Sequence, residues 1–326
     1  MRHTGGTLII ETSGLCKSFR SRAGREKRTV DAVRGVDLSV REGEIFGFLG
    51  PNGAGKTTTL RMLATLIEPD GGDAAIAGAD LRRQPGEVRR RIGYVAQGGS
   101  TWDESSAREE LVLQARSYGL GRREAEYRTA AALAAFQLTE YAGRRCRTYS
   151  GGQRRRLDIA LGIIHAPSVV FLDEPTTGLD PQSRARMWDE IRRLRAEGMT
   201  VFLTTHYLDE ADALCDRVAI IDHGAVVIEG TPDELKRKVS GDIVTVGLDT
   251  GSVADAAGVL KGEFAMNRVE STEDGLRLYV DDGAILIPGV LRVLDAAGIT
   301  LRLIELHRPS LDDVFLTMTG RSLRES

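Results

Sequence analysis

One segment of this 326-residue chain, residues 50–57, restricts the fold more than any other. It reads Gly-Pro-Asn-Gly-Ala-Gly-Lys-Thr and matches the phosphate-binding pattern G-x-x-x-x-G-K-[ST]. We expect an apolar strand over residues 44–49 before it and a helix over residues 57–66 after it, which is the context that the pattern requires. Glycines let backbone N–H groups approach phosphate oxygens closely, and the helix turns its partly positive N-terminus toward them. A chance glycine-rich turn is the alternative, but it does not explain the flanking strand and helix.

The ends of two strands carry the expected chemistry. Lys56 is expected to reach the β- and γ-phosphates of a nucleotide, and the hydroxyl of Thr57 to bind Mg²⁺. A strand over residues 169–172 ends in two acids, Asp173 and Glu174. Because ligand sites of open parallel sheets lie at the carboxyl ends of strands, Asp173 is expected to hold Mg²⁺ and Glu174 to orient or deprotonate the attacking water. Two solvated acids that open a loop are the alternative, which the phosphate-binding loop disfavours.

Gln97 and His206 also follow apolar strands, over residues 92–96 and 200–205. Both are expected at the carboxyl edge of the sheet, where a γ-phosphate would lie. Each signal is weak by itself, because a lone histidine is usually structural.

Composition narrows the class of protein. Apolar residues make up 41% of the chain and charged residues 28%, as in a globular protein, and the net charge of −3 gives no general attraction to nucleic acid. No apolar run approaches the length of a membrane span, and the first residues lack the apolar core of a secretory signal. The scattered Cys16, Cys146 and Cys215 form no metal-binding spacing and fit a reducing cytoplasm. A membrane function would therefore require a partner that supplies the spanning part.

The order of the expected elements predicts two domains. Residues 7–238 alternate short apolar strands with amphipathic helices, as an α/β domain does, and contain a mainly helical insertion at about 100–165. We expect a strand at 7–15 and a basic, polar hairpin loop at 21–28.

Residues 240–320 are predicted to form a small α+β domain. The expected elements are a strand at 242–248, a helix at 252–260, two strands that meet near 274–275, a helix at 285–297 and a strand at 300–306. This βαββαβ order is ferredoxin-like. A last helix over 311–319 is expected, with Ser310 as its cap and Gly320 as its stop.

A further motif, Tyr149-Ser150-Gly151-Gly152-Gln153, opens an amphipathic helix just before the strand at 169–172. This helix N-terminus can bind phosphate only if something presents one. The motif resembles the Leu-Ser-Gly-Gly-Gln signature of ATP-binding cassette (ABC) proteins, with Tyr in the first position. In that family the opposite subunit presents the nucleotide, in a head-to-tail dimer that closes on two ATP molecules. A plain capped helix is the alternative, and it does not explain the whole ordered set of motifs.

The resemblance covers about residues 7–235 and implies roles for the other motifs. Gln97 corresponds to the Q-loop, a sensor between Mg²⁺ and the membrane subunit, and His206 to the switch histidine. Residues 178–180, Gly-Leu-Asp, correspond to the D-loop, which crosses the dimer interface. Phe19 stands where an aromatic side chain stacks on adenine, and a core residue at a strand end is an equal alternative.

The resemblance thus implies a P-loop ATPase of the α/β class that binds ATP and Mg²⁺. The implied catalytic residues are Lys56, Gln97, Glu174 and His206. The implied Mg²⁺ ligands are Thr57, Gln97 and Asp173. The implied ATP contacts are Phe19, Gly50, Pro51, Asn52, Gly53, Ala54, Gly55, Lys56, Thr57, Thr58, Ser150, Gly151, Gly152, Gln153 and Asp180.

Three more segments resemble the daunorubicin/doxorubicin-resistance type of exporter ATPase, whose members carry a C-terminal domain of this length. They are Arg-Arg-Arg-Leu-Asp-Ile-Ala at 154–160, Leu-Asp-Glu-Ala-Asp at 208–212 and Ser-Leu-Asp-Asp-Val-Phe-Leu at 310–316. For the energetics of the three arginines, a solvated helix face is the favoured interpretation.

The resemblance implies an ATP-hydrolysing subunit that lies peripherally on the cytoplasmic side of the cell membrane. It would act as a homodimer with a separate permease, and the permease would contact the transported compound, which is expected to be drug-like or lipophilic. A nucleic acid partner is not expected. One alternative is a soluble ABC ATPase that acts on ribosomes or DNA, although those usually carry two cassettes in one chain or a long coiled coil. A non-hydrolysing regulator is opposed by Glu174, and an importer ATPase is opposed only by the resemblance of the tail.

Overall fold

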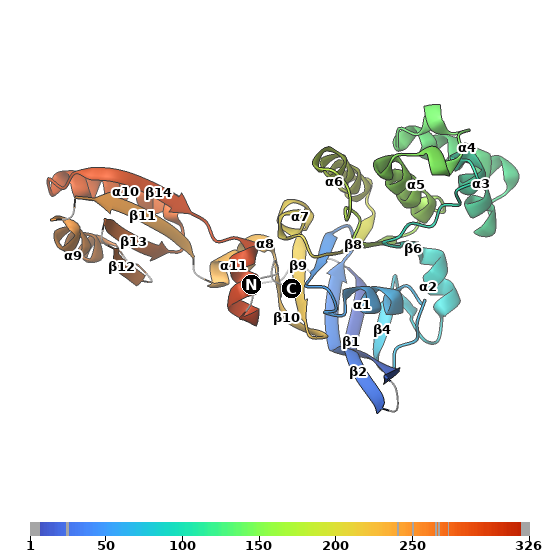
Figure 1. The fold of residues 1–326 in the computed structure, drawn as a ribbon, viewed down its shortest axis with the longest axis horizontal. Coiled ribbons are helices and arrows are strands. Elements are labelled where there is room, and N and C mark those ends of the chain that lie inside the picture. The colour runs from blue at the N-terminus through green and yellow to red at the C-terminus, as the bar shows by residue number, and fades with distance from the viewer. Residues whose placement is uncertain are drawn as a thin grey trace. The chain divides into compact units, whose positions relative to one another are not determined.

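The computed structural model describes residues 7–23, 26–239, 241–249, 251–264, 266, 268–272 and 274–320. The chain divides into one unit that extends to Glu229 and another from Gly230 onward (Figure 1). The division precedes the expected boundary at 238–240, because helix α8 (Pro232–Val239) packs with helix α11 (Leu311–Thr319) of the second unit.

Two sheets form the centre of the first unit. A four-stranded sheet has the order β2-β1-β4-β5, and a six-stranded sheet has the order β10-β9-β3-β8-β7-β6, in which β6, β7, β8, β3 and β9 run parallel. Strands such as β7 are buried along their whole length, which explains their continuous apolar sequence. The strands are β1 (Leu8–Ala23), β2 (Glu26–Arg41), β3 (Ile45–Leu49), β4 (Gly71–Ile76), β5 (Ala79–Asp80), β6 (Ile92–Val95), β7 (Val169–Asp173), β8 (Thr200–Thr205), β9 (Arg217–Asp222) and β10 (Ala225–Gly230).

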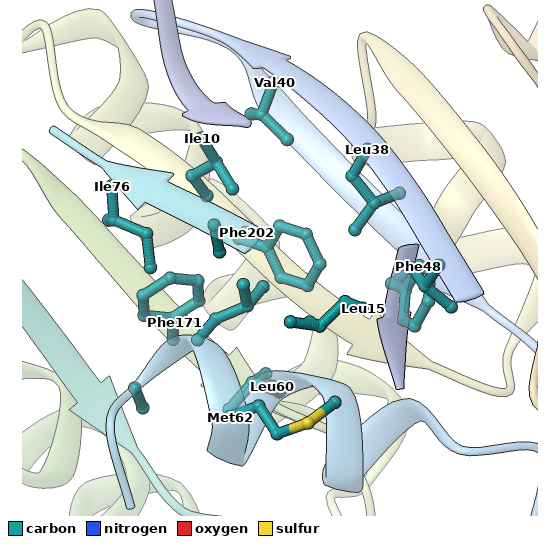
Figure 2. Packing of buried hydrophobic residues seen from close by; sticks show 14 of the residues in the cluster. Ile10, Leu15, Leu38, Val40, Phe48, Leu60, Met62, Ile76, Phe171 and Phe202 are labelled. Atoms are coloured by element: carbon teal, nitrogen blue, oxygen red, sulfur yellow. The ribbon is translucent and has the colours of Figure 1, made fainter. Parts of the chain in front are cut away.

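The core of this unit lies where the two sheets and helix α1 (Lys56–Leu63) meet. Figure 2 shows Ile10 and Ile76 from the antiparallel sheet beside Phe171 and Phe202 from the parallel sheet. Leu60 from α1 packs into the same cluster, so the helix that follows the phosphate-binding loop is held firmly against the sheets.

The helices α3, α4 and α5 of the insertion gather at one side of the unit (Figure 1). Helix α3 packs against both α4 and α5, and α5 also contacts β6. Two of the helices begin with a capping box, Ser106 with Glu109 in α3 and Ser150 with Gln153 in α5. The helices of the unit are α1, α2 (Pro85–Arg91), α3 (Ala107–Ser117), α4 (Arg122–Ala135), α5 (Gly151–Ile163), α6 (Pro181–Ala196) and α7 (Leu208–Leu214), with 3₁₀ turns at Thr139–Tyr141 and Cys146–Thr148.

The second unit contains an antiparallel sheet in the order β12-β13-β11-β14. This order and the βαββαβ connectivity confirm the ferredoxin-like prediction. Alternating residues of β11, such as Val244 and Val246, face a core shared with α9 and α10. The elements after α8 are β11 (Asp242–Leu248), α9 (Val253–Glu263), β12 (Arg268–Thr272), β13 (Gly275–Val280), α10 (Gly283–Ala296), β14 (Leu301–His307) and α11.

One prediction of local structure was wrong. The expected loop at 21–28 is mostly strand, because β1 continues to Ala23 and β2 resumes at Glu26, in direct register with it. The tip of this hairpin, residues 24–25, lies outside the described residues. The basic, polar sequence led to the prediction of a loop. Two strands can nevertheless pair through their backbones without apolar side chains on both faces.

Candidate functional site

The phosphate-binding loop joins β3 to α1, and its own chain requires its glycines. A Cβ atom on Gly50 would lie 2.2 Å from the carbonyl oxygen of Ile221, and one on Gly55 would lie 2.4 Å from that of Ala32. Gly55 also has φ +107° as the N-cap of α1. The loop is therefore pressed against its neighbours, and its backbone is fixed before any ligand arrives.

Lys56 is buried inside this loop, with 4% of its surface exposed. Its Nζ donates hydrogen bonds to the carbonyl oxygens of Gly50 at 2.7 Å and Pro51 at 3.1 Å. It also lies 3.4 Å from Oε1 of Glu174. Burial lowers the pKa of the Lys56 ammonium, although the Glu174 carboxylate opposes this shift.

Thr57 and Asp173 lie side by side, as the sequence predicted for a shared cation. The Thr57 hydroxyl donates to Oδ1 of Asp173 at 3.1 Å, and the Thr204 hydroxyl donates to the same oxygen at 2.8 Å. A hydroxyl and a carboxylate are oxygen ligands of the kind that Mg²⁺ prefers. The residues present therefore fit the implied ion.

Glu174 is the centre of a cluster of polar side chains. Its Oε2 accepts hydrogen bonds from Nε2 of Gln97 at 2.9 Å and from the hydroxyl of Thr177 at 3.1 Å. Nδ1 of His206 lies 3.2 Å from the same oxygen. Glu174 itself has φ +46°, a backbone conformation that non-glycine residues rarely adopt.

The surroundings of Glu174 keep its carboxyl group ionised. Burial alone would raise its pKa, but the neighbouring His206 ring and the Lys56 ammonium outweigh burial and lower the pKa to about 2. A carboxylate held in this form near neutral pH can accept a hydrogen bond or a proton from a water molecule.

Phe19 lies at the edge of the same site. It is 42% exposed, and it lines a cavity of about 310 Å³ together with the phosphate-binding loop, Gln97 and Glu174. This exposure excludes the alternative of a core residue. The lining also includes Pro51, Asn52, Gly53, Gly55, Lys56, Thr57 and Thr58.

The signature segment lies outside this cluster. Ser150 and Gly151 are exposed, and Ser150 forms a capping box with Gln153. The Tyr149 hydroxyl donates to the carbonyl oxygen of Tyr141 at 2.7 Å. Ser150, Gly152 and Gln153 line a separate cavity of about 550 Å³, which shares no lining residue with the cavity at the phosphate-binding loop.

Asp180 also lies apart from the cluster, as the N-cap of α6. Its carboxylate accepts hydrogen bonds from the backbone N–H of Ser183 at 2.9 Å and from the hydroxyl of Ser183 at 2.6 Å. The structure therefore brings Lys56, Gln97, Asp173, Glu174 and His206 together and leaves Ser150–Gln153 and Asp180 elsewhere on the unit.

Three polar residues of this site, Thr177, Thr204 and Arg155, were not predicted from the sequence. Thr204 and Thr177 both donate to the acids, and Thr204 also accepts from the backbone N–H of Glu174 at 3.0 Å. Arg155 is 7% exposed, so the prediction that the three arginines form a solvated face was wrong. Because consecutive residues of a helix point about 100° apart, three adjacent arginines cannot all face the same way, and this spacing was the available signal.

Comparison with known proteins is consistent with this geometry. Residues 33–177 match the family model described as ABC transporter, and residues 230–319 match that of the DrrA1-3-like ATP-binding protein C-terminal domain. The chain is 44% identical over 320 residues to the daunorubicin/doxorubicin resistance ATP-binding protein DrrA of Streptomyces peucetius, covering 98% of this chain and 94% of the relative. The chain belongs to the ABC transporter ATP-binding family. As a member of this family, it is an ATPase.

Other relatives and solved structures agree with this placement. The ABC chain is 39% identical over 323 residues to the Nod factor export ATP-binding protein I of Ralstonia nicotianae, covering 98% of this chain and 97% of the relative. The ATP-binding cassette MJ0796, solved as a dimer in a post-hydrolysis state with ADP and Pi, superposes with a TM-score of 0.61 at 25% identity. This match covers 68% of the ABC chain and 98% of the cassette.

Proposed function

We propose that this ABC ATPase drives the export of a drug-like or lipophilic compound through a separate membrane permease. The observation that carries the proposal is the Glu174 carboxylate, held 3.4 Å from Lys56 and within hydrogen-bonding distance of Gln97. This arrangement provides a base, a cation and an amide at the carboxyl edge of a parallel sheet, which is where such sheets bind their ligands.

In the proposed reaction each side chain has a defined task. The ammonium of Lys56 exchanges the carbonyl oxygens of its own loop for phosphate oxygens of ATP, and the backbone N–H groups of the loop hold those oxygens in place. An Oε atom of Glu174 accepts a proton from the attacking water, while Gln97 and His206 orient that carboxylate. Mg²⁺, held by Thr57 and Asp173, would supply positive charge at the phosphate oxygens.

We also propose that the working form is a head-to-tail homodimer. Support comes from the exposed signature segment and from its separation from the catalytic cluster of the same chain. Ser150 and Gly152 of one chain would complete the site formed by Lys56 and Glu174 of the other. Asp180, at the start of α6, would lie at the interface between the two chains.

The proposed partner is a permease, and the proposed location is the cytoplasmic face of the membrane. Within the part of the chain that the structure describes, no helix is both long enough and apolar enough to cross a bilayer. Relatives are described as resistance proteins for daunorubicin, doxorubicin and linearmycin, or as Nod factor exporters. These names support export over import and over a role in nucleic acid handling, and they cover several different compounds rather than a single one.

The second unit is proposed to be an accessory domain that regulates or stabilises the dimer. All the proposed nucleotide contacts lie in the first unit, and the second unit has a hydrophobic core of its own. It matches the C-terminal family model over residues 230–319.

Transport is tested by expressing the chain in a drug-sensitive host together with a multi-span membrane protein, if the neighbouring gene encodes one, or with the permease of a related exporter. We expect lower accumulation of daunorubicin or of another lipophilic compound, and we expect this effect to disappear when Glu174→Gln replaces the parental chain at equal abundance. ATP turnover that is insensitive to the membrane protein, with no change in accumulation of any compound in the panel, would contradict the proposal.

A further inference from the structure

The guanidinium group of Arg155 binds the backbone beside the two central residues of the site. Its Nε donates to the carbonyl oxygen of Pro175 at 2.9 Å, its Nη1 to that of Ala96 at 2.6 Å and its Nη2 to that of Asp173 at 2.9 Å. Arg155 belongs to α5, whereas Ala96 follows β6, Asp173 ends β7 and Pro175 lies two residues after it. One side chain therefore joins three separate segments.

The positions of these acceptors matter more than their number. The carbonyl groups of Asp173 and Pro175 stand on either side of Glu174, and the carbonyl group of Ala96 precedes Gln97. A carbonyl oxygen that is held in place fixes the plane of its peptide group. Arg155 thereby orients the backbone of both residues whose side chains meet at 2.9 Å in the catalytic cluster.

The backbone of Glu174 needs such support. Its φ of +46° is sparsely populated for non-glycine residues and persists only where the surroundings enforce it. Thr204 supports the N–H side of Glu174, and Arg155 supports the carbonyl groups before and after it. Together they fix the direction in which the carboxylate points.

Burying the positive charge of Arg155 is energetically unfavourable, because the guanidinium group loses its hydration. Burial lowers its pKa, and the carboxylates of Asp158 and Asp173 oppose that shift from a distance. A buried charge is tolerated when its donors are satisfied, and the planar guanidinium can satisfy several carbonyl groups at once. Asp158 is itself held in place, because it accepts a hydrogen bond from the backbone N–H of Ser100 at 3.0 Å.

We infer that Arg155 is a positioning residue for ATP hydrolysis, which sets the placement of Glu174 relative to Gln97. The inference rests on the proposed catalytic role of Glu174. Because Arg155 lies on the helix that begins at Gly151, a movement of the signature segment also moves the group that orients Glu174 and Gln97. The helix is thus a mechanical link between the two ends of the unit that the proposed dimer uses in different sites.

The test compares Arg155→Met, Arg155→Gln and the parental full-length chain in Mg-ATP turnover. Methionine fills similar space without a donor, whereas glutamine retains one amide that can reach part of the carbonyl set. We expect kcat to fall about 10- to 100-fold in Arg155→Met, because small misplacements of reacting groups have effects of this size. Affinity for the fluorescent analogue trinitrophenyl-ATP should stay unchanged, and Arg155→Gln should lie between the other two chains.

A structural arginine elsewhere supplies the control. Arg193 on α6 pairs with Glu190 and Glu197 and covers the ring of Phe136, and none of these contacts involves Lys56, Gln97, Asp173, Glu174 or His206. Arg193→Met should lower the melting temperature without changing turnover per folded molecule. If Arg155→Met behaves in this way, Arg155 merely stabilises the fold and the inference is overturned. Should Arg155→Met fail to fold, Arg155→Gln is judged by the same criterion.

A double-mutant cycle with Glu174→Gln separates this inference from the proposed function. If Arg155 acts through Glu174, adding Arg155→Met to Glu174→Gln should cause little further loss of turnover. An equal loss in both backgrounds overturns the inference alone, as does parental turnover of Arg155→Met beside an impaired Glu174→Gln. Parental turnover of Glu174→Gln itself overturns the catalytic role of Glu174 and the inference together.

Discussion

Helices α1 and α5 both begin at a glycine-containing segment, but the surroundings of their N-termini are opposite. The glycines before α1 are required by the chain itself, since a Cβ on Gly50 or Gly55 would collide with backbone oxygens. At α5, a Cβ on Gly151 would meet only the side chain of Leu179, at an ordinary contact distance of 3.9 Å, although one on Gly152 would lie 3.0 Å from Oγ of Ser183. The small residue at Gly151 has no explanation within its own chain.

The polar side chains at the N-termini of α1 and α5 also differ. The N-terminus of α1 holds the buried Lys56 beside Glu174. The N-terminus of α5 exposes Ser150, and the described residues place none of the catalytic cluster in its cavity. In the proposed dimer, the N-terminus of α1 therefore belongs to a half-site formed within one chain, whereas the N-terminus of α5 would receive its phosphate from the other chain.

The largest effect is expected at the phosphate-binding loop before α1. Lys56→Ala removes the cation that faces the phosphates and leaves Glu174 without its charged neighbour, so productive ATP binding and turnover should both be lost. Each charge-assisted hydrogen bond is worth roughly 1.5–3 kcal/mol, or about 10- to 100-fold in affinity. Direct measurement of nucleotide affinity tests this, and unchanged affinity with normal turnover would remove the assignment of the phosphate-binding loop.

Glu174→Gln should separate binding from chemistry. The amide cannot accept a proton, and a positioned base typically contributes about 10²- to 10⁴-fold to the rate. ATP affinity should persist, and the protein should accumulate as a closed dimer loaded with ATP, which light scattering or sedimentation would detect. Hydrolysis at the parental rate would show that Glu174 is not the base.

Ser150→Arg should lower ATP turnover while leaving Lys56 and Glu174 of the same chain unchanged. The bulky cation occupies the place where a phosphate would dock, so ATP affinity of the separate chains should remain while ATP-driven dimerisation is lost. The loss of the cap is controlled by Ser150→Ala, which should cost only about 0.5–2 kcal/mol of stability. Normal hydrolysis by monomeric Ser150→Arg chains would contradict the proposed dimer.

The pH dependence of ATP binding and hydrolysis should reflect Lys56 and Glu174, the charged pair beside α1. Because the pKa of Glu174 in the free protein is lowered to about 2, this carboxylate stays ionised above that value, and its protonation should not reduce kcat/KM between about pH 5 and pH 8. The pKa of Lys56 is lowered from 10.5, so the free protein should lose nucleotide affinity on the alkaline side earlier than an ordinary lysine would dictate. An acid limb in kcat/KM near pH 6 that vanishes in Glu174→Gln would show that the Glu174 carboxyl group is not held ionised in the free protein.

The smallest effect is expected from removal of the second unit. A chain that ends after Gly230 keeps both helix ends and all the proposed nucleotide contacts, so its ATP affinity should match that of the full chain. A truncated chain that folds, as judged by circular dichroism, but does not bind ATP would show that the second unit contributes to the site.

The sequence predicted those features that depend on local pattern. Apolar strands that end in polar residues located Gln97, Asp173, Glu174 and His206, and helix α11 has the predicted bounds with its predicted capping residue Ser310. The sheet order of the second unit also agrees with the ferredoxin-like prediction.

Features that depend on distant packing were not accessible in the same way. Thr204 becomes part of the site only because β8 pairs with β7 and places its hydroxyl against Asp173. Arg155 was predicted to be solvated like its two arginine neighbours. In the structure, its guanidinium group donates to three carbonyl groups of other segments. Hydrogen bonds between a side chain and distant backbone leave no periodic trace in a sequence.

In the proposed dimer, each ATP site combines Lys56 and Glu174 of one chain with Ser150 of another. Mixing Lys56→Ala chains with Ser150→Arg chains tests it most directly, because a heterodimer collects both lesions in one site and leaves the other site intact. We predict that the mixture regains ATP hydrolysis that neither variant has alone, and that the recovered activity follows the fraction of heterodimer measured by ATP-driven dimerisation. Two results together would contradict the shared site. The first is that heterodimers form with ATP but the mixture hydrolyses no more ATP than the separate variants do. The second is that Ser150→Arg monomers hydrolyse ATP normally.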